Sequence, residues 1–89
     1  MEATKMARLR WACRRGMLEL DVLLGNFLEE ALVYAMPEDQ KKFVDLLDCN
    51  DQQLFMWLTG KEIPSDPDFV YIVQKIRHHA QIRKHASSI

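Results

Sequence analysis

Apolar residues recur at intervals of three and four along most of this 89-residue chain, and no segment shows the strict alternation of a half-buried strand. Such spacing places apolar side chains on one stripe of an α-helix. The clearest stripe lies in residues 18–35 and contains Leu20, Leu23, Leu24, Phe27, Ala31 and Tyr34. We therefore predict an all-α fold, a small single-domain bundle of about five short helices.

Residues that favour helix ends divide the chain into these helices. Proline suits the first helical position, Thr, Asn or Asp can cap a helix, and glycine often follows its last turn. The chain offers such residues at Thr4, Gly16, Pro37, Asn50, Gly60, Asp66 and Pro67. The predicted helices span 4–15, 18–35, 37–48, 51–59 and about 67–82. They form one domain of residues 1–89, with a tail that we expect to be flexible from about 84.

Each predicted helix also supplies residues for a common core. Gly25 interrupts the second helix, and we interpret it as a point of close packing against another helix. Large apolar side chains are usually buried, and we expect this of most of those in the predicted helices. Met56 is the exception, because it lies off the apolar face of its helix and could be exposed. Outside the second helix, the predicted core residues are Met6, Leu9, Cys13, Phe43, Leu46, Leu47, Leu54, Trp57, Leu58, Phe69, Val70, Val73, Ile76 and Ala80.

Charges are sorted along the chain, although the formal net charge is only −1. Residues 1–15 carry five bases, residues 19–68 carry twelve acids, and residues 75–89 carry no acid. The basic ends could steer a charged partner toward the protein. They could equally do no more than offset the partial charges of nearby helix ends. A pI of about 6.3 argues against a committed nucleic-acid binder.

Features of other protein classes are missing from the sequence. No apolar run is long enough to span a membrane, and the first residues resemble neither a secretory signal nor a transit peptide. We therefore expect a cytoplasmic protein of bacterial type, or a matured organelle protein, without membrane insertion. Cys13 and Cys49 form no C-x-x-C motif, so we interpret them as reduced, partly buried thiols.

The sequence offers few groups for catalysis or metal binding. Its serines fall in a turn and in the tail, and it has no glycine-rich phosphate loop. His78 and His85 share a helix face beside His79, but no acid or cysteine joins them locally. Since metal sites normally need three or four ligands, we predict no metal site and no catalytic residue.

The joint between the first two predicted helices carries an unusual set of residues. Arg14 and Arg15 precede Gly16, and Glu19 and Asp21 follow it. A glycine turn between charged helix ends would explain each residue separately. An interface would also explain why Trp11 and Arg8 lie on the same approach, because a partner backbone can come close to a glycine while the charges set the register.

The same residues resemble the succinate dehydrogenase flavinylation (assembly) factor family. Arg15-Gly16-Met17-Leu18-Glu19 matches its RGxxE motif, within the longer stretch WACRRGMLELD of residues 11–21. The segments FVDLLD (43–48) and LFMWL (54–58) resemble the middle of that family, and the length and five helices agree as well. The resemblance covers nearly the whole chain.

This resemblance implies an assembly factor and not an enzyme. Such factors bind the flavoprotein subunit of succinate dehydrogenase, and in bacteria also of fumarate reductase, and promote covalent attachment of FAD to a histidine of that subunit. FAD would belong to the client, and the factor would bind no cofactor tightly by itself. The partner-binding residues carried over are Arg15, Gly16 and Glu19, with Arg8, Trp11, Arg14 and Asp21 around them.

Two alternatives of other classes remain open at this point. The chain could be a small FAD carrier, which flavin fluorescence quenching would reveal. It could also be an antitoxin-like regulatory module that contacts nucleic acid, which salt-dependent DNA binding would reveal.

Overall fold

The computed structural model describes residues 1–87 and contains helices but no strand within them. Its elements are α1 (Ala3–Ala12), α2 (Leu18–Glu30), the 3₁₀ turn η1 (Leu32–Tyr34), α3 (Pro37–Leu46), α4 (Asp51–Leu58) and α5 (Pro67–Ser87). The predicted all-α bundle of five helices is thus confirmed.

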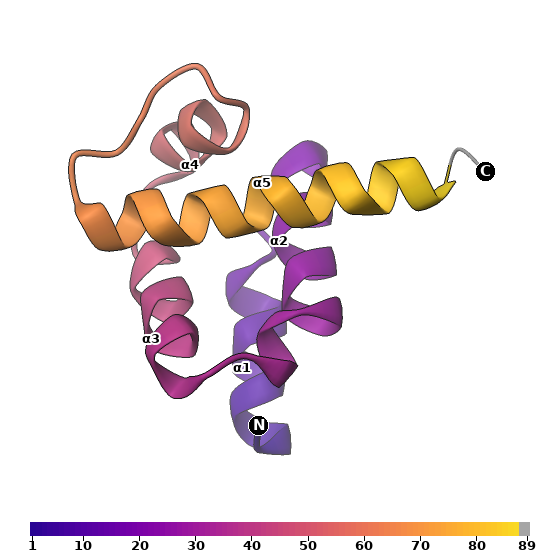
Figure 1. The fold of residues 1–89 in the computed structure, drawn as a ribbon. Helices are drawn as coiled ribbons and strands as arrows, with labels where there is room; N and C mark the ends of the chain where they lie inside the picture. Colours follow the sequence, from indigo (N-terminus) through magenta and orange to yellow (C-terminus); the bar gives the residue numbers. More distant parts are fainter. Residues whose placement is uncertain (88–89) are drawn as a thin grey trace.

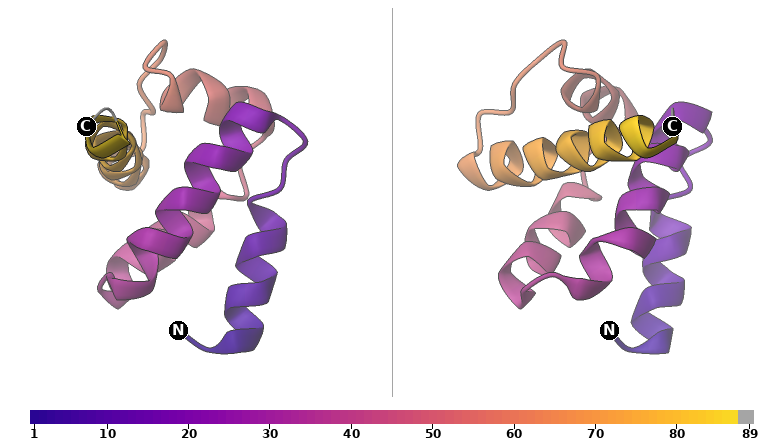
Figure 2. Two further views of the ribbon diagram at one scale, coloured as in Figure 1. Left: turned by 90° about the vertical axis from the view of Figure 1, so that its right-hand side faces the viewer. Right: turned by 45° about the vertical axis from the view of Figure 1, so that its right-hand side comes forward.

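The helices are arranged around α2. Helix α1 rises to a tight loop, and α2 descends from it, so that the two form a helical hairpin (Figure 2). Helix α5 is the longest and crosses in front of α2 and α3 (Figure 1), and both contact it. Helix α4 closes the bundle against α2 and α5. The α1–α2 loop therefore lies at one end of the hairpin, on the periphery of the fold.

The core draws on all five helices and η1. Phe27 and Phe43 meet with ring centroids 5.6 Å apart, which joins α2 to α3. The fully buried side chains include Leu20, Leu24, Leu28, Leu32, Phe43, Leu46, Leu54, Ile72 and Ile76. Leu28, Leu32 and Ile72 were not among the predicted core residues. Trp57, Phe69, Val70 and Ala80 are only partly buried, and Trp57 packs on Phe69.

Tyr34 departs most from its predicted place. We expected it on the buried stripe of a helix that continued to residue 35, but 85% of it is exposed. The reason is a break at Ala31, whose backbone leaves helical geometry (φ −130°, ψ −48°), after which η1 begins. The 3₁₀ turn changes the angular phase of the side chains, so a stripe extrapolated at 3.6 residues per turn no longer applies.

Several helix ends also differ from the prediction. α1 ends at Ala12, not at 15, and its N-cap is Glu2 without a side-chain bond, so Thr4 does not cap it. α3 ends at Leu46, and α5 continues to Ser87, beyond the predicted end at 82. The flexibility expected from 84 stays a prediction, and residues 88–89 lie outside the described part.

The predicted caps of the last two helices are confirmed. The Asn50 side chain accepts a hydrogen bond from the backbone N–H of Gln53 at 2.8 Å, and Asp66 accepts one from Asp68 N–H at 2.8 Å. These bonds satisfy N–H groups that have no partner inside the helix.

The interpretation of Gly25 was wrong. A Cβ built on this residue would meet no atom within 4 Å, so no neighbouring helix requires glycine there.

Ion pairs fix the outer contacts between helices. Arg10 pairs with Glu29 across α1 and α2, and Glu30 pairs with His79 and Arg83 of α5. None of the helices within residues 1–87 is both long and apolar enough to cross a membrane.

Candidate functional site

The loop of residues 13–17 begins where α1 ends. The Cys13 N–H donates to the carbonyl of Leu9, and the Arg14 N–H donates to that of Trp11, which closes the last turn. Gly16 has φ +83°, a left-handed conformation that suits glycine. A Cβ at Gly16 would meet no atom within 4 Å. The loop therefore needs glycine for its backbone, and the space outside it is open.

Arg15 anchors this loop from the inside. Its Nε donates to Asp51 Oδ1 at 2.7 Å, and its Nη1 donates to the carbonyls of Ala12 and Leu47 at 3.0 and 2.8 Å. Its Nη2 donates to the carbonyl of Cys49 at 2.6 Å. Only 16% of the Arg15 side chain is exposed. One guanidinium thus ties the α1–α2 loop to the α3–α4 connection, using the planar fork that arginine provides.

Asp21 holds the same loop from the other side. Its Oδ1 accepts a hydrogen bond from the backbone N–H of Arg15 at 2.7 Å. The mixed-sign residues of the sequence motif are therefore not equivalent. Arg15 and Asp21 bond within the protein, and their assignment to a partner surface stays a prediction.

The other predicted site residues point outward. Arg8, Arg14 and Glu19 are exposed, and 73% of Trp11 is exposed. The Arg14 guanidinium lies 5.6 Å from the centre of the Trp11 ring, a cation–π contact. Within residues 1–87, the side chains of Arg8 and Glu19 make no hydrogen bond or ion pair. Their charges are therefore not neutralised by the fold.

Two apolar residues beside the motif were missed. Leu18 and Val22 lie one turn apart on α2 and are 80% and 47% exposed. The signal was present, because neither belongs to the stripe of Leu20 and Leu24 that enters the core. We call the exposed residues around the loop the Gly16 surface; it comprises Arg8, Trp11, Arg14, Gly16, Leu18, Glu19 and Val22.

The sequence analysis also missed Asp51, the partner of Arg15, because 36 positions separate the two residues in the chain.

The thiols near the loop are poor nucleophiles. Burial raises the pKa of Cys13 to about 12, although the positive charge of Arg15 acts in the opposite direction. Burial also raises the pKa of Cys49. A reactive cysteine needs a thiolate near neutral pH, and burial disfavours the thiolate of both residues. Within residues 1–87, no group of three or more His, Cys, Asp or Glu side chains could hold a metal ion.

Known proteins share this sequence and fold. A family model described as "Flavinator of succinate dehydrogenase" matches residues 7–80. The chain is 45% identical over 80 residues to "FAD assembly factor SdhE" of Shewanella oneidensis, covering 90% of this chain and 98% of that protein. It is 42% identical over 80 residues to the Pseudomonas aeruginosa protein of the same name, covering 90% and 95%.

A solved structure agrees with the fold. The solution structure of a UPF0350 protein superposes with a TM-score of 0.75 at 38% identity, covering 93% of this chain and 89% of the other. The family match spans the Gly16 surface and the helices that position it. From this match and the high identity to its relatives, we conclude that the chain belongs to the flavinator of succinate dehydrogenase family.

Proposed function

We propose that this protein is an assembly factor that binds the flavoprotein subunit of succinate dehydrogenase and promotes the covalent attachment of FAD to that subunit. Family membership and the names of the relatives support the activity. The observation that supports the Gly16 surface as its docking site is the anchoring of the loop by Arg15, which leaves Gly16, Glu19 and the exposed apolar residues facing outward.

The proposed contribution of this protein is binding and orientation, not bond making. A loop anchored by Arg15 and flanked by exposed Trp11 and Leu18 suits a protein interface, because tryptophan is enriched among the residues that supply most of the binding energy there. Holding the client in a reactive conformation can by itself lower a barrier by several kcal/mol. In this proposal FAD belongs to the client, and the flavoprotein subunit of fumarate reductase is a second client.

The test is flavinylation of a purified apo-flavoprotein subunit, read as covalent flavin fluorescence after denaturation. The informative pair is Gly16→Arg and Gly16→Ala. Both place a Cβ in left-handed backbone and share a penalty of about 1–2 kcal/mol, but only arginine adds bulk outside the loop. We expect Gly16→Arg to lose binding and stimulation, and Gly16→Ala to keep both at a temperature where it is folded.

Glu19 provides a second comparison. Since Glu19 has no partner within residues 1–87, Glu19→Gln should weaken client binding while the melting temperature changes little. Glu62→Gln, at an exposed loop position, is the matched control. Wild-type protein that neither binds nor stimulates either flavoprotein subunit would refute the proposal. Quenching of free FAD fluorescence without a client would instead favour a flavin carrier.

A further inference from the structure

A groove lies beside α5, in addition to the Gly16 surface. It has a volume of about 410 Å³ and lies between the C-terminal half of α5, the end of α4 and the first half of α2. Leu23 of α2 and Leu58 of α4 give it an apolar part, and Arg77, Gln81 and Lys84 of α5 give it a polar one. None of the described residues that line it is acidic.

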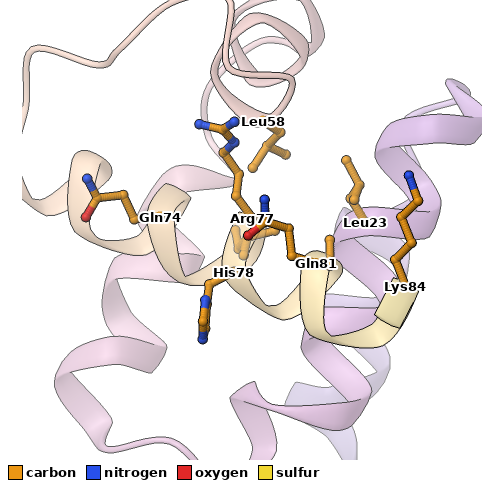
Figure 3. Close-up of a pocket in the computed structure, with 9 residues that line it drawn as sticks. Leu23, Leu58, Gln74, Arg77, His78, Gln81 and Lys84 are labelled. Atoms are coloured by element: carbon orange, nitrogen blue, oxygen red, sulfur yellow. The ribbon is translucent and has the colours of Figure 1, made fainter. Parts of the chain in front are cut away.

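The polar residues form one stripe. Positions 77, 81 and 84 are separated by four and three residues, so they share a face of α5. Figure 3 shows Arg77 and Lys84 extending to the same side of this helix, with Leu58 and Leu23 between them in that view, whereas His78 points to the opposite side. Seven residues of helix separate the two cations by roughly 10 Å along the axis.

The two cations are not used by the fold. Lys75 of the same helix pairs with Asp39, and Arg83 pairs with Glu30. The side chains of Arg77 and Lys84, by contrast, make no hydrogen bond or ion pair within residues 1–87. The Arg77 guanidinium lies close to Gly60, since a Cβ added to that glycine would be 2.6 Å from Nη2. The groove therefore presents positive charge at both ends and an apolar floor.

The groove continues toward the Gly16 surface. Leu23 lies four residues after Glu19 and therefore on the same face of α2, one turn further along. Leu23 and Lys84 both line the groove, so a partner that contacts Glu19 lies one turn of α2 away from it. This continuity favours one partner for both surfaces.

We infer that the groove receives an acidic segment of the client flavoprotein subunit. Carboxylates of that segment pair with Arg77 and Lys84, and an apolar side chain between them packs on Leu23 and Leu58. The inference rests on the proposed function and adds a second point of attachment to it. It follows from charge complementarity, since two unpaired cations in a groove without acids attract carboxylates and repel basic segments.

Site-specific photo-crosslinking tests the occupant directly. A benzoylphenylalanine at Gln81 lies inside the groove, and one at Gln52, exposed on α4 and outside it, is the control. With purified client subunit, we expect a crosslink from position 81 to a peptide rich in Asp and Glu. A crosslink only to a neutral or basic peptide, or none while the subunit is bound, would overturn the inference.

Charge removal gives an independent measurement. Arg77→Gln with Lys84→Gln should weaken client binding about 5- to 30-fold and reduce its salt dependence. Lys5→Gln with Lys41→Gln removes the same charge elsewhere and should leave the Kd unchanged. Lys84→Gln alone should show part of the effect, which guards against loss of folding through Arg77 at Gly60. Equal Kd values for both double variants would overturn the inference alone, whereas wild type that fails to bind would overturn the proposed function.

Discussion

Arg15 illustrates how a motif residue can act within its own protein. Its guanidinium donates to one carboxylate and three carbonyls drawn from the end of α1, the α3–α4 connection and α4. Without this donor, the carbonyls would lie partly buried and unpaired. The free-energy cost of leaving a buried carbonyl unpaired is larger than the net free energy that one hydrogen bond contributes. Arg15 is therefore expected to position Gly16 whether or not a partner also touches it.

At this residue we expect Arg15→Ala to lower the free energy of unfolding by about 2–4 kcal/mol, because it leaves Asp51 and the carbonyls of Leu47 and Cys49 without their donor. Chemical denaturation measures this loss. The neighbouring Arg14→Ala, which removes one exposed cation–π contact, should change stability by about 0.5–1 kcal/mol at most. Similar midpoints for the two variants would show that the anchoring bonds do not stabilise the fold.

At the scale of elements, α2 carries a glycine that it does not need. Gly25 is helical and has open space around its Cα, so Gly25→Ala should raise stability by about 0.5–1 kcal/mol through the lower entropy of the unfolded chain. Gly60→Ala should do the opposite, since Gly60 has φ +79°, a left-handed conformation in which an added Cβ is strained, and the Arg77 guanidinium beside it would have to move as well. Thermal melts of the two variants would disprove this account if both moved in the same direction.

The α1–α2 pairing should also depend on pH. The hydrogen bond from Arg10, and then its charge, lowers the folded-state pKa of Glu29 below the ordinary value of 4.5. A lowered pKa means that the contribution is present above about pH 4.5 and disappears as the pH falls through the folded-state pKa. Glu29→Gln should therefore melt below wild type at pH 7, and by a smaller margin at pH 3. An equal gap at both pH values would contradict this linkage.

At the scale of the whole molecule, Cys13 reports on opening of the fold. It is 3% exposed and its pKa is about 12, whereas Cys49 is only partly buried. An aromatic disulfide reagent at pH 8 should modify Cys49 first and Cys13 at least about tenfold more slowly, because Cys13 must wait for the hairpin to open. The variant Cys49→Ser isolates the slow phase. A fast reaction in that variant would show that the reagent reaches Cys13 without opening of the α1–α2 hairpin.

Much of the architecture follows from local chemistry, and the sequence alone was enough to predict it. Pro37, Asn50 and Asp66 start helices through their own backbone and side-chain geometry, and Gly16 has the left-handed backbone that glycine permits, although α1 already ends at Ala12. The apolar spacing marked most of the core for the same reason, because helical periodicity is a property of neighbours in the chain. The family resemblance was readable in the same local segments.

Only the tertiary structure decided what the motif residues do. Arg15 reaches Asp51 across 36 positions, and no pattern of neighbours encodes such a contact. The break at Ala31 turned Tyr34 outward, and the packing of α5 on α2 and α4 created the groove beside Arg77 and Lys84. Helix periodicity, caps and turns depend on residues that are close together in the chain, and they can therefore be predicted from the sequence. The choice between a side chain that anchors a loop and one that faces solvent depends on which distant backbone lies beside it.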